Sequence, residues 1–270
     1  NGDNMNLSQI IICSDFDGTL TGNPPDGKPF VTTPMGKICR ENIDAIKHLT
    51  SRGGKFVIVS GRSALMMQYI YDYIPADDLM AGTNAAMIYR RSDRKTVALH
   101  PMRMTPAEFA KRISSRADDL PVMHITDCHG VAHGFMPGEG DLSRFLSAFP
   151  TALKIIFDEH DPEKMAALES FLRSSVGDKC EVAKSASFLI ECFDKGGGKG
   201  DMVRYLKSSF PEKTIVALGD YENDLDMLTE ADMAFCPENA SPKVKSVCLA
   251  TLRASGDGFI ADVTERLERL

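Results

Sequence analysis

The sequence predicts an α/β protein, with a doubly wound parallel sheet as its core and an α+β domain inserted into that core. Short runs of β-branched and other apolar residues, typical of strands buried on both faces, alternate with segments of helical periodicity near both ends of the chain. In the middle of the chain this alternation gives way to shorter strand patterns around amphipathic helices. Polar residues and glycines directly follow several of the apolar runs, where open α/β sheets bind their ligands.

Length and composition limit the classes of protein that this chain can belong to. Its 270 residues, 43% of them hydrophobic and 26% charged, are enough for a substantial core. The net charge of −7 argues against a nucleic-acid partner, since binding to phosphate backbones needs clustered Lys and Arg. No apolar run is long enough to span a membrane, and residues 1–4 lack the features of a signal peptide. The seven cysteines form no C-x-x-C pair, so we expect a reduced, cytoplasmic protein. These features leave the oligomeric state open.

The first part of the chain reads as alternating strands and helices. Residues 7–14 form an apolar strand, and a loop rich in Pro and Gly follows at 21–33. The following elements are predicted in chain order: helix 34–50, strand 55–59, helix 64–73 and strand 79–81. This βαβαβ order implies a parallel sheet with right-handed crossovers.

The middle of the chain has a different pattern. A hairpin is predicted from strands at 85–89 and 96–99, followed by other short elements. These are helix 106–120, strands 122–125 and 131–135, helix 142–149, strand 153–157, helix 162–176, and strands 180–183 and 187–193. Short strands around amphipathic helices indicate an inserted α+β domain, which we place at residues 85–195.

The α/β alternation resumes after the glycines at 196–198. The predicted elements are helix 200–210, strand 214–218, helix 223–231, strand 233–235, and helices 241–248 and 259–270. We therefore expect one domain from residues 1–84 and 196–270, interrupted by the insertion.

Four polar segments each follow an apolar strand or begin a helix. They are Asp15-Phe16-Asp17-Gly18-Thr19, Ser60-Gly61-Arg62, Lys199-Gly200, and Gly219-Asp220-Tyr221-Glu222-Asn223-Asp224. The ends of neighbouring parallel strands meet at one edge of a sheet, so these segments are expected to converge. The resulting set of carboxylates, a hydroxyl, an ammonium group and helix N-termini suits phosphoryl transfer.

The charges of these residues suggest their roles. A phosphate monoester would be repelled by the carboxylates unless a hard cation, most simply Mg²⁺, neutralised them. Asp15, Asp220 and the main-chain carbonyl of Asp17 are the candidate metal ligands. Asp15 can attack phosphorus to form an aspartyl-phosphate, and Asp17 can act as the general acid and base.

The phosphate group needs donors of its own. Lys199 supplies a positive charge, and Ser60 supplies a hydroxyl beside the backbone N–H groups around Gly61. Asn223 is a further phosphate-binding candidate. Asp224 is expected, together with Asn223, to orient Lys199 and support the metal ligands, and Thr19 is a second supporting residue.

These segments carry a family resemblance that covers almost the whole chain. The order D-x-D-G-T, S-G-R, K-G and G-D-x-x-N-D resembles the four motifs of the haloacid dehalogenase (HAD) superfamily. The inserted domain resembles its type C2 cap. Other stretches are similar to the Cof-like subfamily of sugar-phosphate phosphatases: Gly82-Thr83-Asn84-Ala85-Ala86, Lys154-Ile155-Ile156-Phe157, Asp161-Pro162-Glu163, Glu191, Asn239-Ala240, Lys243-Val244-Lys245 and Gly256-Asp257-Gly258.

The resemblance implies a Rossmann-like core and an Mg²⁺-dependent phosphatase of small phosphorylated metabolites, most simply sugar phosphates. It implies that Asp15 is the nucleophile, Asp17 the general acid and base, and Asp15, Asp17 and Asp220 the metal ligands. Ser60 and Lys199 would hold the phosphate. The chain departs from the family's usual Asn-Gly-Ala at Asn84-Ala85-Ala86, and from its Met-Gly-Asn-Ala at Cys236-Pro237-Glu238-Asn239-Ala240.

Several alternatives stay open at this level. A phosphomutase would use the same aspartyl-phosphate, and a phospho-ligand sensor could keep the fold without turnover. Lys195 competes with Lys199 for the phosphate, and Arg62 either binds substrate or lies on the surface. Residues 134–141 are a candidate specificity loop. A zinc site and an ATP-binding loop are both disfavoured by spacing, the first at His124, Asp127, Cys128, His129 and His133, the second at residues 196–200.

Overall fold

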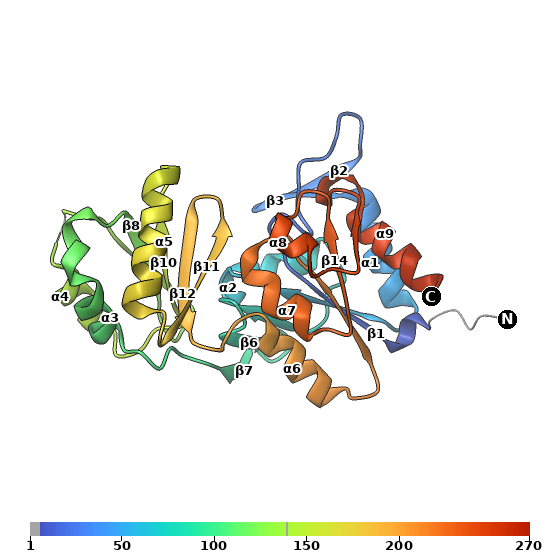
Figure 1. Ribbon diagram of the computed structural model, residues 1–270. Helices are drawn as coiled ribbons and strands as arrows, with labels where there is room; N and C mark the ends of the chain where they lie inside the picture. Colours follow the sequence, from blue (N-terminus) through green and yellow to red (C-terminus); the bar gives the residue numbers. More distant parts are fainter. Residues whose placement is uncertain (1–5, 139) are drawn as a thin grey trace. The chain divides into compact units, whose positions relative to one another are not determined.

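The computed structural model describes residues 6–138 and 140–270, and its contacts divide the chain into two compact units (Figure 1). One unit consists of the chain up to Val97 together with Lys199–Leu270, and the other is Ala98–Gly198. The larger unit is an α/β domain and the smaller one an α+β domain, which confirms the predicted fold class. No helix in the described part of the chain is long and apolar enough to cross a membrane.

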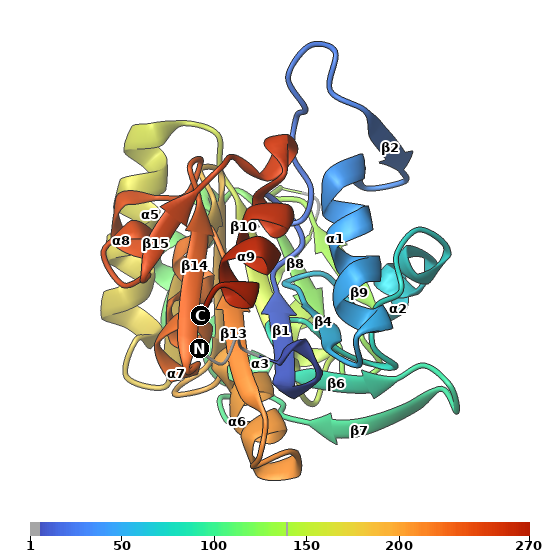
Figure 2. The same ribbon diagram turned by 90° about the vertical axis from the view of Figure 1, so that its right-hand side faces the viewer.

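An eight-stranded sheet forms the centre of the larger unit, with the order β15-β14-β13-β1-β4-β5-β6-β7 (Figure 2). Its strands are β1 (Ile10–Ser14), β4 (Lys55–Val59), β5 (Leu79–Gly82), β6 (Met87–Arg90), β7 (Lys95–Leu99), β13 (Thr214–Leu218), β14 (Met233–Pro237) and β15 (Ala250–Leu252). Strand β1 pairs in parallel with β13 on one side and β4 on the other, and all five of its residues are buried. This environment explains its apolar, β-branched sequence.

The helices of the larger unit alternate with its strands along the chain and pack against the sheet. They are α1 (Arg40–Ser51), α2 (Ala64–Met67), α6 (Gly200–Ser209), α7 (Leu225–Glu230), α8 (Pro242–Lys245) and α9 (Phe259–Glu268). Short 3₁₀ turns are η1 (Leu7–Gln9), η2 (Gln68–Asp72), η4 (Glu222–Asp224) and η5 (Ser255–Asp257). Helix α1 packs against α9, and α6 packs against α7.

The smaller unit contains a five-stranded antiparallel sheet with the order β11-β12-β10-β8-β9. Its strands are β8 (Val122–Thr126), β9 (Ala132–Phe135), β10 (Lys154–Asp158), β11 (Cys180–Ala186) and β12 (Leu189–Asp194). Its helices are α3 (Pro106–Ile113), α4 (Leu142–Ser147) and α5 (Pro162–Val176), with a 3₁₀ stretch η3 (Ser114–Asp119).

The core of the smaller unit follows the alternation of its strands. Ile155 and Phe157 of β10 belong to a buried cluster with Phe109 of α3. The rings of Phe109 and Phe157 stack with their centroids 6.3 Å apart. Lys154, one position away, is instead buried in an ion pair with Glu191 at 2.9 Å. The period of two in a strand therefore separates the apolar side chains from this buried charge pair.

Several predicted boundaries differ from the structure. The hairpin at 85–99 was expected to begin the inserted domain, but β6 pairs antiparallel with β5 and extends the larger sheet, so the boundary falls at Ala98. The predicted helix 34–50 begins only at Arg40, because Gly36–Cys39 (β3) pairs with Phe30–Thr33 (β2) of the expected loop. Strand β15 had not been predicted.

Candidate active site

The polar segments at the ends of three adjacent strands come together in the larger unit. Asp15 follows β1, Ser60 follows β4 and Asp220 follows β13, and β1 lies between the other two strands. Asp15, Ser60 and Asp220 are buried, as is Lys199 before α6. The expected convergence at the carboxyl ends of the parallel strands is therefore confirmed.

Lys199 links two of the carboxylates. Its Nζ lies 2.5 Å from Asp15 Oδ1 and 2.6 Å from Asp224 Oδ1, with its side chain only 1% exposed. Burial disfavours the ammonium form, but the two neighbouring carboxylates outweigh burial and hold the pKa of Lys199 above its ordinary value. The competing Lys195 belongs to the smaller unit and pairs there with Glu181 at 3.3 Å.

Asp224 fixes the turn after β13. Its Oδ2 accepts hydrogen bonds from the backbone N–H of Asp220 (2.9 Å) and Tyr221 (3.0 Å), while its Oδ1 receives Lys199. Gly219 is needed for this closeness, because a Cβ there would lie 2.5 Å from the Cβ of Asp224. Asp224 therefore contacts both the ammonium group of Lys199 and the backbone of Asp220.

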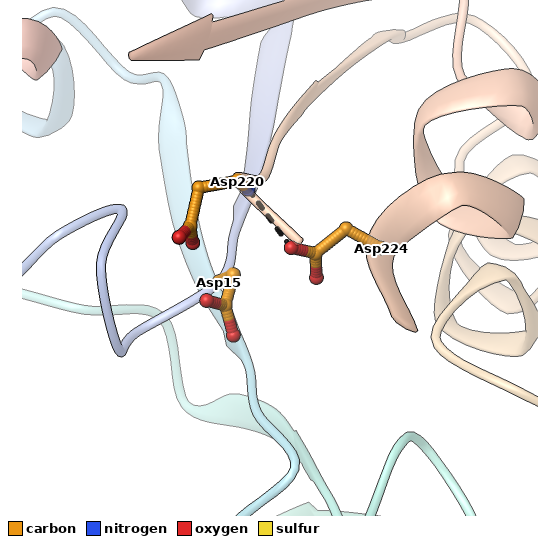
Figure 3. A group of neighbouring side chains, drawn as sticks. All are labelled: Asp15, Asp220 and Asp224. Carbon is orange, nitrogen blue, oxygen red and sulfur yellow. Dashed lines mark hydrogen bonds between the residues drawn. The ribbon is translucent and has the colours of Figure 1, made fainter. Parts of the chain in front are cut away.

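Asp15, Asp220 and Asp224 form a buried carboxylate cluster (Figure 3). One ligand oxygen from each lies within 4.8 Å of the others. Thr19 Oγ1 donates to Asp220 Oδ1 at 2.7 Å and so orients that carboxylate. A Cβ at Gly18 would lie 2.4 Å from Asp220 Oδ2, so only glycine leaves room for this carboxylate.

Burial disfavours the ionised forms of two carboxylates in this cluster. Burial raises the pKa of Asp15 well above its ordinary value, although Lys199 lowers it. Burial, followed by repulsion from Asp224, raises the pKa of Asp220 to about 7. A bound cation would favour the ionised form of both carboxylates.

The cluster fits a divalent metal ion. Its donors are hard carboxylate oxygens, buried and preorganised by Thr19 and by backbone N–H groups. The carboxylates of Asp15 and Asp220 lie close together (Figure 3), whereas both oxygens of Asp224 already accept hydrogen bonds from Lys199 and the backbone. Within the described chain, this is the only group of three or more His, Cys, Asp and Glu residues close enough to hold a metal.

Asp17 lies at the turn after β1 and is more exposed than Asp15. Its carboxylate accepts two hydrogen bonds from Arg62, from Nε at 2.7 Å and from Nη2 at 2.8 Å. The following residue, Gly18, has φ of 84°, a left-handed conformation that glycine adopts without strain. The main-chain carbonyl of Gly18 accepts a hydrogen bond from Asn239 Nδ2 at 2.7 Å. The turn thus directs two aspartates, two residues apart, to different surroundings.

The segment after β4 is fixed by the chain that follows β5. Ser60 Oγ accepts from Arg62 N at 3.0 Å, and Ser60 O accepts from Asn84 N at 3.0 Å. Asn223 Nδ2 reaches Asn84 Oδ1 at 3.3 Å. Ala85 stands where the family usually has glycine, and it adopts a left-handed conformation with φ of 61°. Ser60 and Asn223 are therefore joined through Asn84, and Gly61 lies between Ser60 and Arg62.

Sequence reasoning missed one residue of the site, Asp226, and one contact, between Arg62 and Asp17. Asp226 Oδ2 accepts from Gly200 N at 2.8 Å, at the start of α6, where Lys199 itself makes no capping bond with its side chain. Arg62 was not linked to Asp17. The available signal for a cap supplied from elsewhere in the chain was Lys199 at the N-cap position, in place of Ser, Thr, Asp or Asn.

Among the residues of the smaller unit that were considered for zinc, Asp127, Cys128 and His133 form hydrogen bonds or ion pairs with one another or with neighbouring side chains. His133 Nε2 lies 2.9 Å from Asp127 Oδ2, and Cys128 contacts Thr151. These residues do not form a metal cluster within the described chain. Of the loop at 134–141, residue 139 lies outside the described residues.

Comparisons with known proteins agree with this architecture. The family profile described as haloacid dehalogenase-like hydrolase matches residues 12–127 and 141–263. The chain is 24% identical over 262 residues to the HMP-PP phosphatase of Klebsiella pneumoniae, covering 92% of this chain and 90% of the relative. It is 20% identical over 259 residues to the phosphoglycolate phosphatase of Metallosphaera sedula, covering 95% and 98%.

Solved structures show the same fold. The phosphatase BT1666 of Bacteroides thetaiotaomicron superposes with a TM-score of 0.74 at 18% identity, covering 100% of this chain and 98% of its own. The HAD subclass IIB sugar phosphatase BT4131 does so with a TM-score of 0.74 at 15% identity, covering 96% and 99%. The family match spans most of the chain, so this protein belongs to the haloacid dehalogenase-like hydrolases and is a phosphatase of the Cof-like type.

Proposed function

We propose that this phosphatase hydrolyses small phosphorylated metabolites, most simply sugar phosphates, through an aspartyl-phosphate on Asp15. The observation that carries the proposal is the contact of Lys199 with Asp15 beside Asp220 at the end of β1. This arrangement keeps a carboxylate oxygen, a positive charge and a cation site within reach of one phosphoryl group, as phosphoryl transfer requires. We place the nucleophile at Asp15 because it is the buried member of the pair Asp15 and Asp17.

We propose Mg²⁺ as the cofactor, held by Asp15 and Asp220 and by the main-chain carbonyl of Asp17. Among the residues that the structure describes, the carboxylates of Asp15, Asp17 and Asp224 form ion pairs with two cationic side chains, Lys199 and Arg62, and Asp220 adds a fourth carboxylate. When bound, the ion supplies the positive charge that a dianionic phosphate needs in this acidic site.

The reaction then proceeds in two displacements. An oxygen of Asp15 attacks phosphorus while the bond to the leaving alcohol breaks, and Asp17 gives its proton to that alcohol oxygen. Water next attacks the aspartyl-phosphate and transfers a proton to Asp17, which releases inorganic phosphate and regenerates Asp15. Lys199, Ser60, Asn223 and the backbone N–H groups around Gly61 hold the phosphoryl oxygens in both steps.

The substrate class rests on the relatives and on the inserted domain. Relatives act on HMP-PP and phosphoglycolate, and BT4131 is a sugar phosphatase. We propose that Ala98–Gly198 is a type C2 cap that reads the leaving group. A cytoplasmic location stays a prediction, supported by the seven free cysteines. No nucleic-acid or membrane partner is proposed.

Phosphate release from a panel of sugar phosphates, HMP-PP and phosphoglycolate tests this function. With Mg²⁺ present we expect turnover of at least one ester, which EDTA abolishes and Mg²⁺ restores. Asp15→Asn should be inactive. Turnover by Asp15→Asn that equals the wild-type rate would rule out the mechanism, and interconversion of isomers without phosphate release would favour a phosphomutase.

A further inference from the structure

We propose that Arg62 is a positioning residue that holds the carboxylate of Asp17 in its working orientation. This inference rests on the proposed function, in which Asp17 is the general acid and base. The guanidinium donates from Nε to Asp17 Oδ2 at 2.7 Å and from Nη2 to Asp17 Oδ1 at 2.8 Å. This fork uses both carboxylate oxygens and fixes the plane of the group, which a single contact cannot do.

The base of the Arg62 side chain is itself anchored. Its backbone N–H donates to Ser60 Oγ at 3.0 Å, and its carbonyl accepts from Thr83 N at 2.8 Å. Ser60 follows β4 and Thr83 follows β5, so two neighbouring strands of the sheet determine where the guanidinium begins. Asp17 is held from the other side, because the carbonyl of Gly18 accepts from Asn239 at 2.7 Å.

Folding stability is not a sufficient reason for this pair. The side chains of Arg62 and Asp17 are 37% and 47% exposed, and ion pairs with this exposure contribute little to stability. Within the described residues, both hydrogen bonds to the Asp17 carboxylate come from Arg62. Without them, the carboxylate at this exposed turn would be free to change its rotamer.

The two-point contact suits a group that must exchange protons. While one oxygen of Asp17 carries the proton, that oxygen releases its bond to Arg62, and it can accept the bond again once the proton has passed to the leaving alcohol. The other oxygen keeps its hydrogen bond, so Asp17 stays aimed at the reacting atoms. A lysine at this position could make only one such contact.

A double-mutant cycle tests the proposal. Arg62→Ala, Arg62→Lys, Asp17→Asn and Arg62→Ala/Asp17→Asn are assayed with p-nitrophenyl phosphate and with a sugar phosphate. Arg62→Ala should lower kcat by roughly 10- to 100-fold, as expected for a misplaced catalytic group, with KM changed less than about twofold and the melting temperature unchanged. Arg62→Lys should be intermediate. In the Asp17→Asn background, Arg62→Ala should have no further effect.

Two controls separate positioning from other roles. Guanidinium ion added to Arg62→Ala should restore part of kcat, and it should have no effect on Asp17→Asn. Arg90 makes the same kind of fork with Asp93, at 3.1 and 2.9 Å, on the hairpin between β6 and β7. Arg90→Ala should therefore behave as wild type.

Other outcomes overturn the proposal. A large rise in KM, or an equal loss in both backgrounds, would make Arg62 a substrate-binding residue. A fall in the melting temperature of Arg62→Ala that accompanies its loss of activity would make Arg62 a structural residue. If the wild-type enzyme hydrolyses no ester, the proposed function fails. In that case, calorimetry of orthovanadate binding tests the contact between Arg62 and Asp17. We expect Arg62→Ala to weaken orthovanadate binding only when residue 17 is Asp. Any other pattern refutes the positioning role.

Discussion

Gly18 shows how a single residue permits the site. Its φ of 84° turns the chain after β1, and a side chain there would lie against Asp220 Oδ2. Gly27 has a similar φ of 78°, but a Cβ there would meet nothing within 4 Å. Comparing substitutions at Gly18 and Gly27 therefore distinguishes the effect of backbone strain from the effect of crowding the carboxylate cluster.

We predict that Gly18→Ala abolishes phosphate release, while Gly27→Ala leaves it intact. Both variants should lose about 1–2 kcal/mol of unfolding free energy from the left-handed conformation, and Gly18→Ala should lose more because Asp220 must move. Chemical denaturation and phosphate-release assays measure the two effects. Wild-type activity in Gly18→Ala would contradict the assignment of Asp220 to the site.

Lys199 is the only cation in contact with Asp15 among the described residues. Lys199→Ala should abolish turnover and lower the unfolding free energy by about 3 kcal/mol, because it leaves buried carboxylates without their partner. Denaturant titration in EDTA gives the stability change. Lys195→Ala, which removes an exposed pair in the other unit, should change neither property, and the opposite result would favour Lys195 as the phosphate ligand.

At the scale of elements, helix α6 depends on a contact from α7. Asp226 of α7 accepts from the N–H of Gly200 at 2.8 Å, and Lys199 immediately precedes α6. Burial raises the pKa of Asp226 to about 6, although the hydrogen bond from Gly200 partly opposes this effect. This carboxylate thus fixes the helix start and, through it, the origin of the Lys199 side chain.

We expect Asp226→Ala to cost about 1–2 kcal/mol of stability, as other lost helix caps do, and to lower kcat. Asp226→Asn should retain part of both, since its amide oxygen can still accept the hydrogen bond. Arg204→Ala, on the exposed face of α6, is the matched control and should have little effect. Full activity in Asp226→Ala would show that α6 places Lys199 without this contact.

The elements also show what could be predicted from the sequence. Buried parallel strands such as Ile10–Ser14 and Thr214–Leu218 are continuous apolar runs, and the acids and glycines after them marked the site. Strands β2 and β3 were missed because Phe30–Thr33 and Gly36–Cys39 are partly exposed and pair only with each other. The contact between Arg62 and Asp17 spans 45 residues, and no periodicity encodes it.

At the scale of the whole molecule, metal binding should couple to folding. Burial raises the pKa of Asp15 and of Asp220, so a cation bound beside them would favour their ionised forms in the folded chain. Mg²⁺ at 100 times its dissociation constant should add about 2.7 kcal/mol to the unfolding free energy. Thermal unfolding of the full chain with EDTA or with Mg²⁺ measures this, and Asp220→Asn should respond less. Equal melting temperatures for the wild type in both conditions would contradict the site.

We propose above all that Asp15 carries the phosphoryl group between substrate and water. The most direct measurement is rapid acid quench of the enzyme during turnover of a hydrolysed ester, followed by peptide mass spectrometry. We expect a phosphoryl group on the peptide that contains Asp15 and none on the same peptide of Asp15→Asn. Phosphate release with no phosphorylated peptide at any quench time, or with the phosphoryl group on another residue, would contradict it.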